Sequence, residues 1–585
     1  MEQENLSQKR HSLAHLLGAA VLELYPKSNL TLGPAIDDGF YYDIDVAGKI
    51  TEEDLPKIES KMKELLSGWK NFTGKEISYE EAKELYKENP YKLELIEEHK
   101  DKGLSIYSAG SPAVSKAEWF SDLCRGGHIE NPSAEIKEGS WKLDRVAGAY
   151  WRGDENNKML TRIYGLAFET KEDLDVYIKN LEEAEKRDHR KLGAQLKIFT
   201  VSPLVGSGLP LLQPNGMIIR KEIEDYLWSL HKDKGYDRVW TPHIAKIALY
   251  ETSGHAEKFG DELFRVQGKE ESFIMKPMNC PHHMQIFSDN HWSYRDMPVR
   301  YFEPATVYRD EKTGQLGGLT RVRAITQDDG HLFCRSIQIG QEIKTIVSII
   351  KDFYTTMGMI DGYWVRLSLR GDDKSKYLGT DEVWEIAEKA LTDVCIEENL
   401  PYKPAKDEAA FYGPKLDFMF KDAIGREWQL ATIQCDFNLP ERFNLSFINE
   451  KGEKERPVVI HRAISGSLER FMGVMIEHFA GIFPTWLSPV QVAIVPVKED
   501  HLEFSKEIEN KLRCISARTK IISSKENLGT RIHEAKKMNT PYVIVIGDKE
   551  KDSGELTIEK RDGEKIKITV EEFINNISEE IKNRI

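Results

Sequence analysis

Hydrophobic and polar residues alternate with two different periods in the first part of the chain. Residues 7–25 and 51–69 have the spacing of amphipathic helices, whereas residues 33–45 and 148–168 alternate like strands connected by turns. A mixture of helices and strands of this kind is typical of an α+β domain. We therefore predict an α+β domain at residues 1–170.

A charged segment separates this domain from the rest of the chain. Within residues 171–192, apolar side chains recur along a single helical stripe, and most of the remaining positions are charged. A polar helix with one apolar stripe is typical of a surface helix or a connection between domains. We predict a linker helix at residues 171–194.

Most strands predicted in the next block are joined by turns and not by helices. They are residues 299–309, 320–327, 363–369, 415–422 and 427–437. Successive strands joined by turns form antiparallel sheets. We predict a domain at residues 195–487 with a central antiparallel sheet, which begins with a helix at 217–233.

From residue 488 onward, short apolar strands alternate with amphipathic helices at 500–513 and 527–538. This alternation predicts an α/β domain at residues 488–585. The fold class as a whole is therefore a multidomain α+β and α/β protein.

The composition narrows the classes of function. The 585 residues include 82 Lys and Arg against 97 Asp and Glu, a net charge of −15, so contact with RNA has to come from local basic patches. None of the six cysteines forms a CxxC pair, which is typical of reduced intracellular proteins. No apolar run reaches the roughly 20 residues that cross a bilayer. We expect a cytoplasmic protein that binds neither membranes nor DNA.

Three residues of metal-binding type are spread over the central block. Cys280, His331 and His461 lie far apart in the sequence, and each taken alone is more often structural than functional. Three nitrogen and sulfur ligands would leave the fourth position of Zn²⁺ open, as in catalytic zinc sites. Spacing alone does not assemble this set.

Two further segments carry residues suited to a nucleotide. A glycine-containing loop within residues 308–323 has Arg309 at one end and Arg321 at the other. Arginine binds phosphate through two nitrogens and keeps its charge. Farther on, Gly466 and Ser467 open a helix with Arg470 in its first turn. Taken singly, the loop is explained equally well as a solvated hairpin, and the helix is better explained as an ordinary capped helix.

Taken together, these segments resemble the signature motifs of class II aminoacyl-tRNA synthetases, and the chain is similar to the threonyl-tRNA synthetase family. The similarity runs from about residue 7 to the C-terminus, in strings such as "RHSLAHLLGAAV", "GFYYDID", "KPMNCPHHMQIF", "RVRAITQDDGH", "AFYGPKLDF" and "IHRAISGSLERF". The resemblance implies a class II catalytic domain that ligates L-threonine to tRNA(Thr) through threonyl-adenylate, with ATP and Mg²⁺.

The resemblance also implies a role for individual residues. Cys280, His331 and His461 match the family's zinc ligands, so one Zn²⁺ per chain is expected. The matching catalytic positions are Arg309, Arg321, Gln327, Asp329, Lys415 and Arg470. The matching substrate-binding positions are Glu311, Ile325, Tyr412, Gln429, Gln434 and Ser467.

Rejection of serine requires a second site. A site that engages the hydroxyl of threonine can reject valine by ~10⁴–10⁵, but serine keeps the hydroxyl and lacks one methyl group, worth only ~1–3 kcal/mol. The resemblance implies that the N-terminal domain hydrolyses seryl-tRNA, with residues His11, His15, Lys92, Asp122, Cys124 and His128. From spacing alone, HxxxH with CxxxH also fits a four-ligand zinc site, and this alternative stays open.

The resemblance extends to both ends of the chain. It implies an anticodon-binding domain at 488–585, with contacts expected at Arg531, Glu550 and Lys560. It also implies a homodimer through the helix and strand at the start of the catalytic domain. A small domain that usually precedes the first helix is expected to be absent, since ten residues precede His11.

Some positions depart from the family's usual residues. Ile325 stands in place of a phenylalanine that stacks on adenine, and Leu430-Ala431 replace Cys-Gly beside the threonine pocket. Gly127 replaces a common proline, which predicts a looser turn, and Glu559 stands where an arginine often reads the anticodon.

Two other functions fit parts of the chain. An RNA-binding regulator that has lost catalysis would have lost zinc ligands or ATP-binding arginines, and a free-standing editing hydrolase would lack the ligase core. The three predicted zinc ligands, Arg309 and Arg470 are all present. The sequence therefore favours the ligase.

Overall fold

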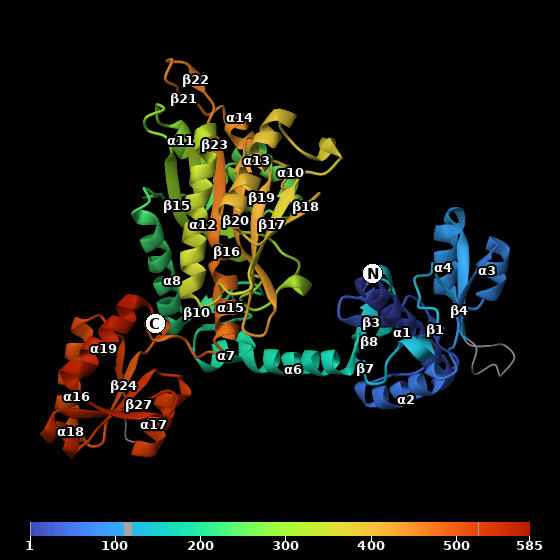
Figure 1. The fold of residues 1–585 in the computed structure, drawn as a ribbon, viewed down its shortest axis with the longest axis horizontal. Coiled ribbons are helices and arrows are strands. Elements are labelled where there is room, and N and C mark those ends of the chain that lie inside the picture. Colours follow the sequence, from blue (N-terminus) through green and yellow to red (C-terminus); the bar gives the residue numbers. More distant parts are fainter. Residues whose placement is uncertain (1, 110–119, 524–525) are drawn as a thin grey trace. The chain divides into compact units, whose positions relative to one another are not determined.

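The computed structural model describes residues 2–109, 120–523 and 526–585, which form two compact units (Figure 1). The units are Met1–Glu182 and Glu183–Ile585.

Helix α1 (Glu2–Leu24) forms the centre of the first unit and packs on α2 (Leu55–Leu66) and on a twisted antiparallel sheet. That sheet has the order β1-β3-β8-β7, with bounds Asn29–Leu30, Gly39–Asp45, Met159–Ala167 and Trp141–Tyr150, and β2 (Ala35–Ile36) pairs with β3. Apolar residues of α1, such as Leu13 and Leu17, are buried against Phe40 and Ile44 of β3. The predicted α+β fold of this part is confirmed.

A second, smaller sheet of this unit carries residues of the N-terminal site. Strands β4 (Phe72–Ile77), β5 (Leu104–Ala109) and β6 (Phe120–Leu123) pair antiparallel in that order. Helices α3 (Tyr79–Leu85) and α4 (Pro90–His99) connect β4 to β5, and Asn89 caps α4 by accepting hydrogen bonds from the first turn.

The prediction of a single linker helix at 171–194 is wrong in one respect. Helix α6 (Lys171–Arg187) ends before Asp188, and a separate helix α7 (His189–Gln195) follows. Asp188 leaves the helical region, with φ −47° and ψ 116°, and its carboxylate accepts a hydrogen bond from the backbone N–H of Arg190. The aspartate therefore acts as the N-cap of a new helix.

The central sheet of the second unit has eight strands in the order β11-β15-β16-β23-β20-β19-β17-β18. Their bounds are Asp237–Arg238, Val299–Tyr308, Ala324–Cys334, Val458–Ser467, Glu427–Asp436, Lys415–Lys421, Trp364–Leu369 and Tyr402–Lys406. The interior pairs are antiparallel, as predicted, but both edge pairs are parallel. At one edge, α13 (Asp381–Glu397) provides the crossover that a parallel pair requires.

Helices α8 (Pro214–Lys232), α12 (Ile339–Thr356) and α15 (Leu468–His478) pack with this sheet around a common core. Short helices α9 (Ile247–Ser253), α10 (His255–Phe259), α11 (Cys280–Ser288) and α14 (Asn438–Arg442) lie in its connections. The strand predicted at 320–327 begins at Ala324 and runs on to Cys334, so that His331 lies within it.

The C-terminal part forms a five-stranded sheet in the order β25-β24-β26-β27-β28, with bounds Thr519–Ile521, Val492–Pro496, Tyr542–Ile546, Glu555–Lys560 and Lys565–Thr569. Its helices are α16 (Leu502–Cys514), α17 (Leu528–Lys537), α18 (Asp548–Ser553) and α19 (Val570–Asn583). The first three strands are parallel, and the last two extend the sheet as an antiparallel hairpin. The α/β prediction is confirmed, although β28 and α18 were not predicted.

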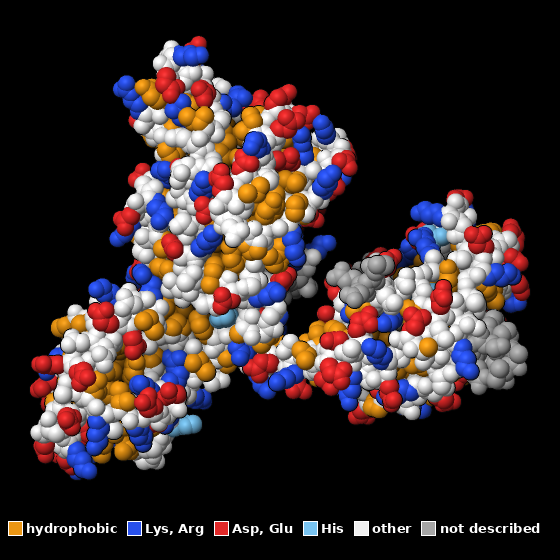
Figure 2. Space-filling view, in the orientation of Figure 1, with side chains coloured by type: hydrophobic (Ala, Val, Ile, Leu, Met, Phe, Trp, Pro, Cys, Tyr) orange, Lys and Arg blue, Asp and Glu red, His pale blue; other side chains and the backbone are white. Residues whose placement is uncertain are grey.

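The surface agrees with the balance of charges in the sequence. Acidic and basic side chains are interspersed over the face shown in Figure 2. Among the described helices, none has the length and apolar character needed to span a membrane.

Candidate functional site

Cys280, His331 and His461 come together in the second unit. His331 on β16 and His461 on β23 are direct cross-strand partners, and Cys280 begins α11. The candidate ligand atoms of all three residues lie within 4.8 Å of one another, and all three side chains are buried. The geometry therefore assembles the set that spacing in the sequence could not.

Hydrogen bonds orient both imidazole rings. Nε2 of His461 lies 2.8 Å from a carboxylate oxygen of Asp436, and Nδ1 of His331 lies 2.8 Å from Nδ1 of His283. The remaining nitrogens, Nε2 of His331 and Nδ1 of His461, face each other at 2.9 Å. With the thiol of Cys280, they form a donor set that suits Zn²⁺.

Burial sets the protonation of this cluster. It lowers the pKa of His331 well below its ordinary value, so the imidazole is neutral. It also raises the pKa of the Cys280 thiol well above its ordinary value. A neutral imidazole is the form that binds a metal, and the thiol becomes a ligand when a cation compensates the charge of the thiolate.

Polar side chains predicted for substrate binding surround the cluster. Asp329 lies two residues before His331 on β16, and its carboxylate accepts a hydrogen bond from Asn279 at 3.0 Å. Tyr412 donates to the side-chain oxygen of Gln434, and its ring lies 5.6 Å from the ring of His461. These groups form a polar wall beside the three ligands.

The predicted ATP-binding residues lie on the β15–β16 hairpin and at the start of α15. Glu311 accepts two hydrogen bonds from Arg321, at 2.7 and 2.9 Å. Arg470 donates to the backbone carbonyl of Thr320 at 3.0 Å, and Ser467 caps α15. The hairpin and the helix are therefore joined.

Two groups in this region have unused hydrogen-bonding capacity. Among the described residues, the buried Nε of Arg309 and the buried Oε1 of Gln327 have no hydrogen-bond partner. Gln327 on β16 is the cross-strand partner of Ser467 on β23, and Ile325 on β16 pairs with Val307 on β15. Buried polar groups are normally satisfied, so unpartnered ones in a predicted site suit a ligand.

Lys415 and Gln429 are linked by a residue that the sequence reasoning missed. Asp417 is fully buried and accepts hydrogen bonds from Lys415 at 2.7 Å, Gln429 at 2.9 Å and Arg366 at 3.0 Å. Asp417 lies two residues after Lys415 on β19, so the period of the strand was the signal that could have found it.

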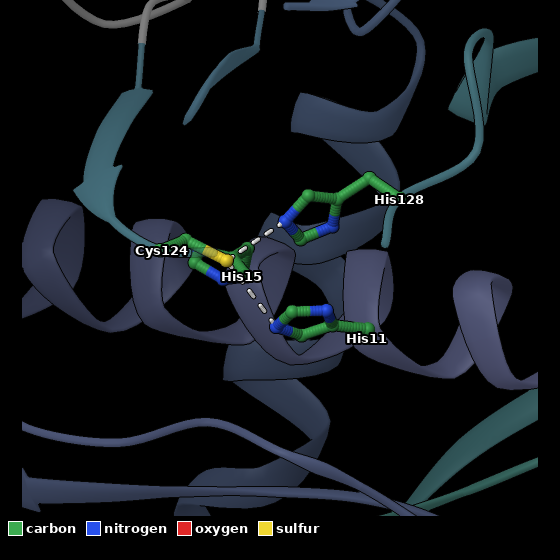
Figure 3. Close-up of side chains that lie close together, drawn as sticks. All are labelled: His11, His15, Cys124 and His128. Carbon is green, nitrogen blue, oxygen red and sulfur yellow. Dashed lines mark hydrogen bonds between the residues drawn. The ribbon is translucent and has the colours of Figure 1, made fainter. Parts of the chain in front are cut away.

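The N-terminal unit brings together a second set of residues (Figure 3). The ligand atoms of His11, His15, Cys124 and His128 lie within 4.8 Å of one another. The sulfur of Cys124 lies 3.2 Å from Nε2 of His128 and 3.6 Å from Nε2 of His11. Helix α1 supplies two of the histidines at i and i+4, and the loop after β6 supplies the other two residues.

His11, His15 and Cys124 of this set border a cavity of about 340 Å³ that Lys92, Asp122 and Tyr42 also line. Lys92 lies 2.6 Å from Asp122, both side chains are almost fully buried, and Tyr42 donates to the second oxygen of Asp122. The predicted editing residues therefore form one continuous site with a paired charge at its base.

Burial also controls protonation in this cavity. It lowers the pKa values of His11, His15 and His128, and it raises the pKa of Cys124 to about 11. The three imidazoles and the thiol are thus uncharged near neutral pH. Uncharged imidazoles can position a water molecule, and they also remain able to bind a metal.

The predicted anticodon contacts lie in the C-terminal part, and among the residues that the structure describes no hydrogen bond or ion pair joins them to one another. Arg531 is buried and donates to the backbone carbonyls of Pro496 and Val497. Glu550 accepts hydrogen bonds from Gly547 and Thr557. Lys560 pairs with Glu564 at 2.7 Å, and Glu559 pairs with Lys536. Contact of these residues with RNA stays a prediction.

Comparisons with known proteins agree with this architecture. Residues 264–479 match the tRNA synthetase class II core domain (G, H, P, S and T), and residues 491–580 match an anticodon binding domain. Residues 104–164 match the threonyl and alanyl tRNA synthetase second additional domain.

Individual relatives are similar over nearly the whole chain. The threonine–tRNA ligase of Rubrobacter xylanophilus is 47% identical over 560 residues, which cover 95% of this chain and 86% of that protein. The ligase of Thermotoga maritima is 45% identical over 579 residues, 98% of this chain and 88% of that protein. A crystal structure of the RNA binding domain of threonyl-tRNA synthetase from Cryptosporidium parvum has a TM-score of 0.64 at 34% identity, and it covers 67% of this chain and 98% of that one.

The antiparallel core and the three matched domains define a class II aminoacyl-tRNA synthetase. At 45–47% identity over almost its full length, the chain belongs to the threonine–tRNA ligase family.

Proposed function

We propose that this protein ligates L-threonine to tRNA(Thr) with ATP, through threonyl-adenylate, and hydrolyses seryl-tRNA in its N-terminal unit. The observation that carries the proposal is the convergence of Cys280, His331 and His461 beside the arginines of the β15–β16 hairpin. The membership of the family supports the same reaction.

In the adenylation site, the residues of this chain position the substrates and compensate charge. Arg309, with an unpartnered Nε, binds the α-phosphate of ATP, which enters with Mg²⁺, and Arg470 lies at the adenine side. Asp329 holds the ammonium group of threonine. Cys280, His331 and His461 fit Zn²⁺, because the sulfur and one nitrogen of each histidine lie within 4.8 Å of one another. A zinc ion held there would supply a Lewis acid for the hydroxyl and amino groups of threonine.

The editing cavity has a simpler task, since the ester of seryl-tRNA is already activated. The neutral imidazoles of His11, His15 and His128 orient a water molecule, and Lys92 provides positive charge for the developing oxyanion. No charged nucleophile is needed. The alternative in which His11, His15, Cys124 and His128 bind zinc has the same geometric support, and metal analysis of the N-terminal variants distinguishes the two.

The remaining parts of the proposal concern organisation. We propose an editing domain at 1–170, a linker at 171–194, a catalytic domain at 195–487 and an anticodon-binding domain at 488–585.

A homodimer is supported by exposed apolar side chains that gather just before α8 and in its first turn, namely Val201, Leu204, Val205, Leu211 and Met217. The cytoplasm is the proposed location.

A regulator that has lost catalysis is the weaker alternative. Such a protein has no need for a buried Cys-His-His cluster or for an arginine with a buried, unpartnered nitrogen, both of which carry a desolvation cost. The relatives from Rubrobacter xylanophilus and Thermotoga maritima are both ligases, which also favours the ligase.

The proposed reaction is tested by ATP–pyrophosphate exchange with threonine, serine and valine. Threonine and serine should both support exchange, and valine should be slower than threonine by about 10⁴ or more, because it lacks the hydroxyl that the site engages. Exchange with none of the three amino acids would exclude the ligase reaction.

The loop between Cys124 and His128 allows a further test of the editing cavity. Gly127 has φ +82°, a conformation closed to proline, whose ring holds φ near −65°. Gly127→Pro should therefore redirect the backbone and slow the deacylation of seryl-tRNA by about 10–100-fold, with threonine activation unchanged. Gly127→Ala is the matched control, because the nearest atom to an added Cβ is 3.9 Å away, so the variant adds the strain of a positive φ, on the order of 1–3 kcal/mol, without a clash and without the fixed φ of proline. If the proline variant deacylates as fast as wild type, this turn does not position the site.

A further inference from the structure

Two buried carboxylates are connected by hydrogen bonds to the histidines of the candidate zinc site, one to each histidine. We propose that Glu303 and Asp436 are positioning residues that determine which ring nitrogen of His331 and of His461 carries the proton. In this way the two unprotonated nitrogens converge on one point. The inference rests on the zinc site proposed above.

Asp436 acts on His461 directly. One of its oxygens accepts hydrogen bonds from the backbone N–H groups of Asn438 at 2.7 Å and Leu439 at 2.9 Å. The other oxygen lies 2.8 Å from Nε2 of His461. Because a carboxylate only accepts, Nε2 must be the donor, and Nδ1 is then the ring nitrogen that can be left without a proton.

Glu303 acts on His331 through His283. The backbone N–H of Thr241 donates to Oε1 of Glu303 at 2.7 Å, and Nε2 of His283 lies 2.9 Å from Oε2. His283 therefore donates through Nε2 and accepts through Nδ1. Its Nδ1 lies 2.8 Å from Nδ1 of His331, which must donate, so Nε2 of His331 carries no proton.

The two chains of hydrogen bonds begin on different strands, at Glu303 on β15 and at Asp436 on β20. Both end at the place where the rings of His331 and His461 meet. They leave Nε2 of His331 and Nδ1 of His461 facing each other at 2.9 Å with no proton between them. Two lone pairs at this distance repel each other unless a cation lies beside both. Partners of this kind, behind histidine ligands, set the tautomer of metal sites.

The substitution Glu303→Gln tests the proton arrangement without changing the shape. The backbone N–H of Thr241 keeps an oxygen at the Oε1 position, so the amide NH₂ takes the position that faces His283. Donor and acceptor then exchange roles in each hydrogen bond between residue 303 and His331. His283 accepts through Nε2 and donates through Nδ1, so the proton of His331 lies on Nε2. By the same reasoning, Asp436→Asn exchanges donor and acceptor in the hydrogen bond between residue 436 and His461.

The experiment measures the Zn²⁺ affinity of purified full-length protein by competition with a chelator. Glu303→Gln should weaken zinc binding by about 10–100-fold, and by at least as much as Glu303→Ala, which leaves His283 free to adopt either tautomer. Glu342→Gln is the matched control, since Glu342 is equally buried but pairs with Arg300 at 2.7 Å through both oxygens and has no hydrogen bond or ion pair with a histidine among the described residues. It should bind zinc like wild type.

A merely structural role of Glu303 predicts the opposite order of zinc affinities, with the truncated Glu303→Ala binding zinc more weakly than the isosteric Glu303→Gln. That order would overturn the inference. So would zinc affinity in Glu303→Gln equal to wild type. If Glu303→Ala does not fold, the comparison of Asp436→Asn with Glu342→Gln decides in the same way. Wild-type protein that binds no zinc at all would instead remove the proposed metal itself, and the inference with it.

Discussion

Cys280→Ala and His331→Ala are each expected to lose the bound Zn²⁺ and, with it, the ability to distinguish threonine from valine. Each variant removes one of three buried ligands whose candidate atoms lie within 4.8 Å of one another. Without the position that engages the hydroxyl, discrimination should fall from about 10⁴–10⁵ to about 10² or less, the limit for a pocket that reads shape alone. Metal analysis and pyrophosphate exchange with both amino acids measure the two effects.

The matched control is Cys435→Ala. Cys435 is also a buried thiol, on β20 beside Asp436, but it belongs to the apolar core, because neighbouring side chains of a strand point to opposite faces. This variant should keep its zinc and its selectivity while losing some stability. The assignment is wrong if His331→Ala retains a full complement of metal and full threonine activation.

The spacing of apolar residues along the sequence predicted most of the fold. Alternation over two residues marked β3 and β7 of the first unit, and an apolar stripe marked helices such as α16, because apolar burial imposes both patterns. The break at Asp188 was missed, since a single capping aspartate interrupts an otherwise helical pattern. The parallel edge strands were missed because pairing partners are not local in sequence.

The candidate site was predictable in part for the same reason. Gln327, Asp329 and His331 are spaced two apart, which favours one face of β16, and His461 lies opposite His331. The residues behind this face could not be predicted. Glu303, His283 and Asp436 act through register and through contacts between distant segments, which no local pattern encodes.

The double variant His15→Ala/Cys124→Ala is expected to accumulate seryl-tRNA while it activates threonine at the wild-type rate. His15 and Cys124 line the cavity of about 340 Å³ in the N-terminal unit, whereas the residues proposed for adenylation lie in the second unit. Removing two groups that orient water should slow the deacylation of pre-formed seryl-tRNA by about 10²–10⁴-fold, the usual range for a positioned acid–base group. Deacylation and pyrophosphate exchange are measured on the same preparations.

The reciprocal variant makes this test decisive. Cys280→Ala should lose its selectivity for threonine over valine but deacylate seryl-tRNA at the wild-type rate, because effects at sites in separate units without shared partners are nearly additive. Serine makes a second site necessary, since it offers the same hydroxyl as threonine to the adenylation site and differs there by one methyl group, a factor of about 10–200. Equal deacylation by wild type and the double variant would remove the His11–His15–Cys124–His128 cavity as the editing site. Loss of threonine activation in the double variant would show that the two reactions are coupled through the linker and not independent.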